Sequence, residues 1–340
     1  MIIVLKPKVT RSQVEAVIRE VRKLGYKPHP IIGVERTVVA AIGDERAHHT
    51  LETLTSMPGV DQVMPVQRRY KLVSRESRLG GTKGSLITVN GHVFGGPKFQ
   101  VIAGPCSVES EKQILETARA VQKAGATFLR GGAFKPRTSP YEFQGLKEEG
   151  LRLLARAREE TGLGMVTEVL SEGDVGLVAE YADILQIGAR NAQNFALLIA
   201  AAQTGKPILL KRGMNMKIEE WFLSAEYILS HGNPNVILCE RGIRTFETLT
   251  RNTLDLGAVA LAKMETHLPV IVDPSQGAGR TDLVGALCKA SPAVGADGLL
   301  VEVHPNPKEA LSDGAQQMTL QQFSRMMTEL KPFIRAANRR

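Results

Sequence analysis

Four short apolar segments decide the fold of this chain, and each ends in charged or reactive residues: ILLKR at 208–212, VILCER at 236–241, PVIVDPSQ at 269–276 and LLVEVHP at 299–305. Their apolar residues are continuous and do not alternate with polar ones, which is typical of strands buried on both faces of a parallel sheet. Helix-length amphipathic stretches separate the segments. If the sheet closes into a barrel, the polar strand ends meet at one face, where barrel enzymes place their chemistry.

Four similar segments precede these along the chain: FQVIAGPCS at 99–107, FLRGGAF at 128–134, MVTEV at 165–169 and ILQIGAR at 184–190. Eight strands that alternate with helices predict an α/β protein with a (β/α)8 barrel, the TIM barrel. A doubly wound open sheet is the alternative, but no GxGxxG turn follows an early strand. Asn90-Gly91 between apolar flanks predicts a β-hairpin before the first barrel strand. We therefore expect a barrel domain at residues 86–340, with a hairpin at its start.

The N-terminal part has a different pattern and predicts a separate small domain at residues 1–72. Strand and helix signals follow one another in the order βαββαβ, which is the ferredoxin-like arrangement. Thr10 and Gln13 form a predicted capping box for the first helix, and Gly33 to Arg36 separate the second and third strands. The Gly-, Ser- and charge-rich stretch at 73–85 is the expected linker.

Composition limits the classes of function. The chain has 340 residues and a net charge of +8, and its basic residues are scattered, with one Trp and five Tyr as stacking platforms. This pattern favours small anionic substrates over nucleic acid. No apolar run approaches the length of a membrane span, and the N-terminus lacks the features of a signal peptide, so a cytoplasmic location is expected. Three cysteines without framework spacing argue against a disulfide scaffold.

Basic residues follow four of the predicted strands, and we expect them to gather at the mouth of the barrel. They are Arg130 and Lys135, Arg190, Lys211 and Arg212, and Arg241 and Arg244. Like charges at one mouth repel each other unless an anion neutralises them, so a phosphate, or a carboxylate with a phosphate, is the expected ligand. The loop Lys135-Pro136-Arg137-Thr138-Ser139 adds cations and hydroxyls suited to a second phosphorylated group. Two adjacent anion sites indicate a reaction with two substrates.

Possible metal ligands also stand at strand ends. Cys106 follows the first predicted barrel strand and Glu302 ends the eighth, and these strands are neighbours in a closed barrel. With Asp313 and the residue at position 276, they form a mixed thiolate and carboxylate set that suits Mn²⁺, Fe²⁺, Co²⁺ or Zn²⁺. A buried structural thiol is the alternative for Cys106, and the interpretation of Cys239 and Cys288 is structural.

Seven motifs in order resemble those of 3-deoxy-D-arabino-heptulosonate 7-phosphate (DAHP) synthases. They are AGPCSVES at 103–110, LRGGAFKPRTSPYEFQG at 129–145, QIGARNAQN at 186–194, LLKRG at 209–213, CERGIRTFE at 239–247, VDPS at 272–275 and VEVHPNPKEALSDG at 301–314. The N-terminal part resembles the subgroup with a ferredoxin-like regulatory domain. The resemblance implies the first step of the shikimate pathway, in which phosphoenolpyruvate condenses with erythrose 4-phosphate and phosphate is released.

The resemblance also implies a role for each matching residue. The phosphate and carboxylate of phosphoenolpyruvate would be held by Arg130, Lys135, Arg190, Lys211 and Arg241, with Lys135 as a candidate proton donor. Erythrose 4-phosphate would contact Arg137, Thr138 and Ser139. Cys106, Glu302 and Asp313 match three of the four metal ligands of the family, and the bound metal would polarise the aldehyde.

Position 276 departs from the family pattern, because the family has histidine after VDPS and this chain has Gln276. An amide oxygen is a weaker ligand than imidazole for a transition metal ion, so a lower metal affinity is expected. The alternatives are a working enzyme, a catalytically impaired variant, and a barrel that now serves as a binding or regulatory subunit. His304 is a conceivable substitute ligand, although the family carries a histidine there that is not a ligand. Thr281 also stands where arginine is commoner.

Three further expectations come from the resemblance. The related 3-deoxy-D-manno-octulosonate 8-phosphate synthases usually read KANRS where this chain has KPRTS, which leaves that activity as a minor alternative. For the N-terminal domain we expect feedback control by tyrosine or phenylalanine, with His29 as a candidate effector contact; a domain that only stabilises an oligomer is the alternative. The family implies a homotetramer.

Overall fold

The computed structural model describes residues 1–33, 36–43, 51–64, 69–81, 84–136 and 139–340. The chain forms two compact units, Met1–Arg69 and Tyr70–Arg340. No helix within these described ranges is both long enough and apolar enough to cross a membrane.

The first unit is an antiparallel sheet with the strand order β2-β3-β1-β4 and one long helix. In chain order its elements are β1 (Ile2–Leu5), α1 (Arg11–Lys23), β2 (Lys27–Ile32), β3 (Thr37–Ile42), the short 3-10 helix η2 (Thr53–Ser56) and β4 (Val60–Met64). This is the predicted ferredoxin-like arrangement, and the capping box of Thr10 and Gln13 is present. The expected second helix falls largely on residues 44–50, which lie outside the described ranges.

One face of this sheet carries the core of the unit, and the other is open. Ile3 and Leu5 of β1 and Val39 of β3 are fully buried together with Val17 and Val21 of α1. The alternate residues of the strands face the other way, and there Ile31, Ile42 and Met64 are exposed. The amphipathic pattern of α1 therefore determines which face is covered.

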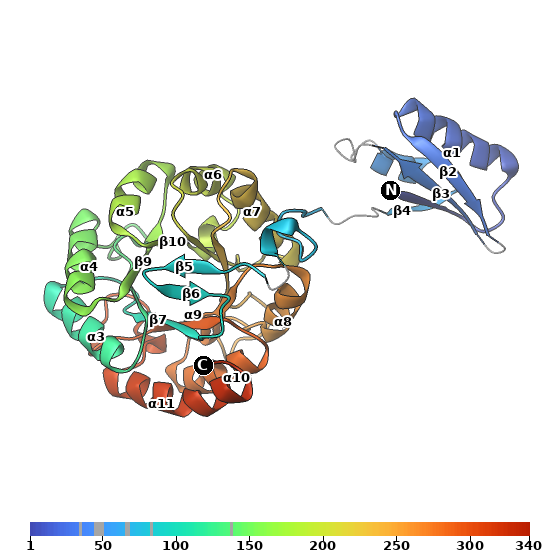
Figure 1. Cartoon of the computed structure of the whole chain (residues 1–340). Coiled ribbons are helices and arrows are strands. Elements are labelled where there is room, and N and C mark those ends of the chain that lie inside the picture. The colour runs from blue at the N-terminus through green and yellow to red at the C-terminus, as the bar shows by residue number, and fades with distance from the viewer. Residues whose placement is uncertain (34–35, 44–50, 65–68, 82–83, 137–138) are drawn as a thin grey trace. The chain divides into compact units, whose positions relative to one another are not determined.

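The second unit is a closed barrel of eight parallel strands surrounded by helices, as predicted (Figure 1). The strands are β7 (Gln100–Gly104), β8 (Phe128–Arg130), β9 (Gly164–Val169), β10 (Ile184–Ile187), β11 (Ile208–Lys211), β12 (Val236–Glu240), β13 (Val270–Val272) and β14 (Gly298–Glu302). The helices are α3 (Glu111–Lys123), α4 (Glu148–Thr161), α5 (Val175–Tyr181), α6 (Phe195–Gln203), α7 (Ile218–Ser230), α8 (Leu256–Glu265), α9 (Pro274–Ala278), α10 (Thr281–Ala293) and α11 (Leu320–Ala336). Pairing of β14 with β7 closes the barrel.

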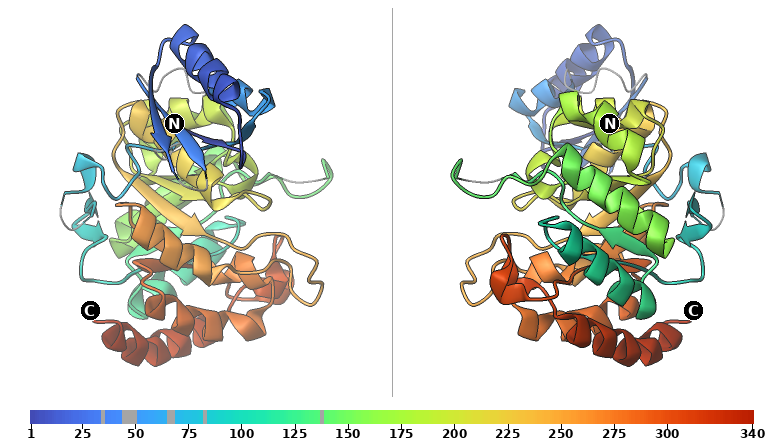
Figure 2. Two further views of the ribbon diagram at one scale, coloured as in Figure 1. Left: turned by 90° about the vertical axis from the view of Figure 1, so that its right-hand side faces the viewer. Right: turned by 90° about the vertical axis from the view of Figure 1, so that its left-hand side faces the viewer.

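The inside of the barrel is packed, and the predicted hairpin lies across one end of it. The hairpin consists of β5 (Ile87–Val89) and β6 (His92–Phe94), joined at Asn90-Gly91, where both residues have positive φ angles. Its apolar residues join the inward-facing side chains of the strands in one buried cluster, and the ring of Phe94 lies 5.1 Å from that of Phe128. Figure 2 shows the hairpin at one end of the barrel and the extended loop after β8 at the other.

The boundary between the units differs from the sequence-based one at residue 72. Residues 70–81 and 84–85, which include most of the expected linker at 73–85, belong to the barrel unit. Val73 is fully buried, and the Glu226 carboxylate accepts hydrogen bonds from the backbone N–H groups of residues 71–73. The His267 ring contacts the Leu72 carbonyl and the Ser85 hydroxyl. Gly and Ser composition predicted a free linker, but these long-range contacts fasten the segment to the barrel.

Candidate active site

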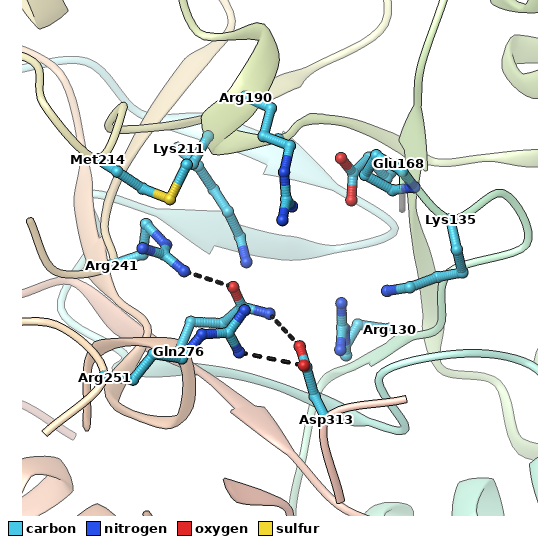
Figure 3. A pocket seen from close by; sticks show the side chains of 13 residues that line it. Arg130, Lys135, Glu168, Arg190, Lys211, Met214, Arg241, Arg251, Gln276 and Asp313 are labelled. Atoms are coloured by element: carbon cyan, nitrogen blue, oxygen red, sulfur yellow. Dashed lines mark hydrogen bonds and ion pairs between the residues drawn. The ribbon is translucent and has the colours of Figure 1, made fainter. Parts of the chain in front are cut away.

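Five of the seven predicted cations meet at the carboxyl ends of the barrel strands, whereas the exposed Arg244 does not line the cavity there. Arg130 is the last residue of β8 and Lys211 the last of β11, Arg241 follows β12, and Lys135 and Arg190 lie in the loops after β8 and β10. All five line one cavity of about 610 Å³, which includes its open mouth (Figure 3). The other lining residues are Pro136, Glu168, Gly188, Ala189, Met214, Arg251, Gln276 and Asp313. The parallel strands therefore bring cations together from distant parts of the sequence.

Two of these cations are held by buried ion pairs. Arg130 Nη1 lies 2.8 Å from Glu302 Oε1, and Lys211 Nζ lies 2.6 Å from Asp273 Oδ2; all four side chains are nearly inaccessible to solvent. Burial opposes the charge of Arg130, yet the carboxylate of Glu302 raises the pKa of the guanidinium above its ordinary value. These carboxylates fix the positions of the cations at the floor of the cavity.

Other donors remain available to a ligand. Burial lowers the pKa of Arg241, and the nearby Arg251 cation acts in the same direction. The Nε atoms of Arg130 and Arg241 are buried, and neither has a hydrogen-bond partner within the described part of the chain. Buried donors without partners are costly, so an anionic ligand that accepts from them would stabilise the site.

Lys135 lies against Cys106. Its Nζ is 3.1 Å from both the Sγ and the carbonyl oxygen of Cys106, and both residues are buried. Burial opposes the charge of Lys135, but the adjacent Cys106 sulfur and the carboxylates of Glu168 and Glu302 raise the pKa of the ammonium above its ordinary value. Lys135 is therefore protonated near neutral pH and can act as a proton donor at this end of the cavity.

Cys106, Glu302 and Asp313 form a group that could hold a metal ion, since one ligand atom of each lies within 4.8 Å of the others. The Sγ of Cys106 is 3.5 Å from Asp313 Oδ2. Burial, reinforced by Glu302, raises the pKa of the Cys106 thiol to about 11. Burial also opposes the charge of Glu302, but Arg130 and Lys135 lower its pKa to about 2, so this carboxylate is ionised. The donor set fits a borderline divalent cation.

The backbone of Asp313 contributes to this arrangement. Its φ of 50° and ψ of 33° lie in the left-handed region, which aspartate tolerates better than most residues. The other carboxylate oxygen, Oδ1, lies 3.1 Å from Arg251 Nη1. A locally unfavourable backbone and a fixed cation thus direct the carboxylate toward Cys106.

Gln276 fits the metal group less well. It lies in the first turn of α9, where the Asp273 side chain caps its backbone N–H. Its Nε2 donates to Glu302 Oε1 at 3.0 Å and to Asp313 Oδ2 at 3.3 Å, and its Oε1 accepts from Arg241 Nη2 at 2.7 Å. Figure 3 shows the contacts with Asp313 and Arg241. The amide therefore points its nitrogen, which cannot bind a metal ion, at two of the three possible ligands, Glu302 and Asp313.

Sequence reasoning did not identify three residues that line the cavity, Glu168, Met214 and Arg251. Glu168 lies within the apolar segment MVTEV, where its charge is the only signal. Arg251 lies in the loop between β12 and α8, far from any strand end. Burial opposes the charge of Arg251, while Asp313 raises its pKa. No strand-end pattern could have indicated Arg251, because a loop places it.

Some of the predicted residues do not join the cavity. Arg212 is buried in ion pairs with Glu240 and Asp255, both at 3.0 Å, and so has a structural contact instead of a place at the mouth. His304 Nε2 pairs with Glu109 Oε2 at 3.2 Å, and its Nδ1 accepts from the Asn306 N–H, so both ring nitrogens are engaged away from the metal group.

The predicted sugar loop and effector contact are described only in part. Arg137 and Thr138 lie outside the described residues. Ser139 is half-buried, and its hydroxyl accepts a hydrogen bond from the Tyr141 N–H. His29 is an exposed residue of β2 in the first unit, opposite Ala40 of β3.

Comparison with protein families agrees with this geometry. The model of the DAHP synthetase I family matches residues 86–336, which includes the whole barrel. The chain belongs to this family. A second model, the DAHP synthase ferredoxin-like domain, matches residues 1–68. The family is generally metal-dependent, and it serves the biosynthesis of aromatic amino acids.

Similar proteins include members with two activities. The chain is 50% identical to the phospho-2-dehydro-3-deoxyheptonate aldolase of Thermotoga maritima, over 97% of each chain. It is 34% identical to the 2-dehydro-3-deoxyphosphooctonate aldolase of Rhodopseudomonas palustris, over 71% of this chain and 90% of that one. The crystal structure of the Thermotoga maritima aldolase (DAHP synthase) superposes with a TM-score of 0.92 at 48% identity, covering 100% of this chain and 98% of that one. A truncated form of the synthase from the same organism superposes with a TM-score of 0.73 over 79% of this chain and 98% of that chain.

Proposed function

We propose that this protein is a DAHP synthase that condenses phosphoenolpyruvate with erythrose 4-phosphate. The observation that carries the proposal is a single cavity in which six cations face a group of possible metal ligands. The full-length similarity to the Thermotoga maritima enzyme supports it. The motif KPRTS at 135–139 favours this activity over that of the phosphooctonate aldolases, which match only part of the chain.

The cations would hold phosphoenolpyruvate and orient its reactive methylene carbon. The buried Nε atoms of Arg130 and Arg241 have no partner among the described residues, and Lys211 and Arg190 line the same cavity. Bidentate guanidinium contacts suit a carboxylate and a phosphate. The enclosed position of Arg130 and Lys211 reduces the competition of water for these anions.

The sugar phosphate would enter above this site, where Arg137, Thr138 and Ser139 follow the cavity residue Pro136. The new carbon–carbon bond forms between the methylene carbon of phosphoenolpyruvate and the aldehyde carbon. The aldehyde oxygen takes a proton, for which Lys135 is the candidate donor. Water then adds to the carbon that carries the phosphate, and inorganic phosphate leaves.

Cys106, Glu302 and Asp313 would hold a divalent metal ion, with Mn²⁺, Fe²⁺, Co²⁺ and Zn²⁺ as candidates. Such an ion supplies a Lewis acid that polarises the aldehyde carbonyl. Gln276 would contribute its amide oxygen only after a change of the orientation described above. We therefore expect a lower metal affinity than with histidine at this position.

For the first unit we propose regulation by tyrosine or phenylalanine, in a cytoplasmic homotetramer. Two features support a role apart from catalysis: residues 1–69 form a compact unit distinct from the barrel unit, and Ile31, Ile42 and Met64 are exposed on one face of its sheet. His29 remains a candidate effector contact. Addition of each amino acid to the full chain and to a chain without residues 1–69 tests this role, and regulation predicts inhibition of the full chain alone.

The activity itself is tested by consumption of phosphoenolpyruvate with erythrose 4-phosphate, in chelator-treated protein with and without added Mn²⁺. The Gln276→His variant runs alongside. Metal-dependent turnover by the parent chain supports the proposal. Turnover by the variant alone would identify an impaired synthase with a binding or regulatory role, and faster turnover with arabinose 5-phosphate would identify the octulosonate activity.

A further inference from the structure

Gln276 connects the proposed anion site to the proposed metal site through the two ends of one amide. Its oxygen accepts from Arg241 Nη2 at 2.7 Å and its nitrogen donates to Asp313 at 3.3 Å (Figure 3). The same nitrogen also donates to Glu302 at 3.0 Å. An amide has an acceptor end and a donor end that cannot substitute for one another. Whether a ligand is bound at one site therefore determines whether the amide oxygen or the amide nitrogen faces the other site.

The amide is the part of this network that can move. The outer oxygen of Asp313 is held by Arg251 at 3.1 Å, and that of Glu302 by Gln316 Nε2 at 2.6 Å. The backbone of Gln276 is fixed in α9 by the cap from Asp273. The carboxylates and the helix thus keep their places, and rotation about the last side-chain bond of Gln276 is the available change.

A cation among Cys106, Glu302 and Asp313 would repel the amide nitrogen that now faces it and attract the oxygen. A half-turn of the amide brings the oxygen to the cation but places the NH2 group against Arg241. A guanidinium has only donors, so two donors would then face each other in a buried place. Without an acceptor between them, this arrangement is unfavourable.

A phosphate bound at Arg241 removes the conflict. Its oxygens accept from the guanidinium and from the turned NH2 group together. The rotated amide then places its oxygen at the cation and its NH2 group at the phosphate, so both contacts are favourable. We expect histidine at this position to lack this linkage, because the single acceptor nitrogen of a neutral imidazole can face the cation whether or not an anion is bound at Arg241.

We propose that Gln276 is a positioning residue that couples the two sites, so that phosphate at Arg241 strengthens metal binding and metal strengthens phosphate binding. The inference rests on the proposed function in taking Arg241 as an anion contact and Cys106, Glu302 and Asp313 as metal ligands. By linkage the two effects must be equal. Coupling between two sites commonly changes affinity about tenfold. We expect a change of that size in addition to the effect of the attraction between the bound metal ion and the bound phosphate.

The test measures Mn²⁺ binding to the chelator-treated full chain by titration calorimetry, with and without saturating inorganic phosphate. At a pH where the imidazole is neutral, Gln276→His and Gln276→Leu provide matched controls, because both keep every charge in the site and neither has an amide to turn. We expect phosphate to tighten Mn²⁺ binding about tenfold more in the parent chain than in either variant. The reverse titration, phosphate with and without Mn²⁺, should give the same factor.

Equal effects of phosphate in the parent chain and both variants would overturn the coupling while leaving the two sites intact. Binding of Mn²⁺ to the histidine variant alone, even with phosphate present, would also overturn it, since the amide would then not serve as a ligand. Failure of phosphate to bind any of the three proteins would remove the anion site of the proposed function, and the coupling with it.

Discussion

Glu302→Gln should destabilise the barrel strongly, because it leaves the charge of Arg130 buried without its partner. The pair is 2.8 Å long, and its side chains are 3% and 0% exposed. Gln316 and Gln276 also donate to Glu302 and lose an ionised acceptor. Removal of one partner from a buried ion pair costs about 3–5 kcal/mol. At about 2–4 °C per kcal/mol for a large domain, the melting temperature should fall by roughly 10 °C.

The unfolding of the barrel unit can be measured separately by tryptophan fluorescence. Trp221, the single tryptophan, is fully buried in α7, so its fluorescence follows the unfolding of the second unit. The measurement is made with chelator present, which excludes a contribution from bound metal. Glu148→Gln is the matched control, since it breaks the exposed pair with Arg152 and should cost at most about 0.5 kcal/mol. A loss for Glu302→Gln as small as that of the control would refute the reasoning.

Three further results are expected. Gly188→Ala should raise the KM for phosphoenolpyruvate about tenfold with little change in stability, because a Cβ there would lie 1.9 Å from Glu168 Oε1 and would displace that carboxylate within the cavity; an unchanged KM in steady-state kinetics would contradict this. Lys135→Met should lower kcat about 10²-fold if the ammonium donates a proton, and a change confined to KM would show a binding role instead. Burial lowers the pKa of His267, so the unfolded chain binds a proton at this residue below about pH 6.5 while the folded form resists it, and the stability toward urea should fall as the pH drops below that value. A His267→Gln variant with the same pH profile would exclude this residue as the cause.

The sequence was most informative where the backbone alone determines position. Continuous apolar segments predicted the eight strands, and a strand that ends in a charged residue must present it at the barrel mouth, which placed Arg130 and Lys211 correctly. Neighbouring strands in a closed barrel also predicted that Cys106 and Glu302 would meet. These inferences require only the positions of the apolar segments along the sequence and the closure of the sheet into a barrel.

Other features depend on tertiary contacts that no local pattern encodes. Arg212 directly follows Lys211, the last residue of β11, but is held by ion pairs with Glu240 and Asp255, which are distant from it in the sequence. Arg251 reaches the cavity from a loop, and the segment at 73–85 packs on the barrel in spite of its linker-like composition. The orientation of the Gln276 amide follows from its neighbours, none of which is adjacent in sequence.

The hairpin of β5 and β6 closes the amino-terminal end of the barrel. Because the rings of Phe94 and Phe128 and the inward-facing aliphatic side chains fill the space beneath the cavity, the described residues leave passage only through the mouth that the strand ends surround. Both substrates and the products must therefore use the same opening. The ligand that binds deepest has to bind first and be released last, and water displaced from the cavity has to leave past the incoming ligand. The closed end of the barrel thus imposes an order of binding and release.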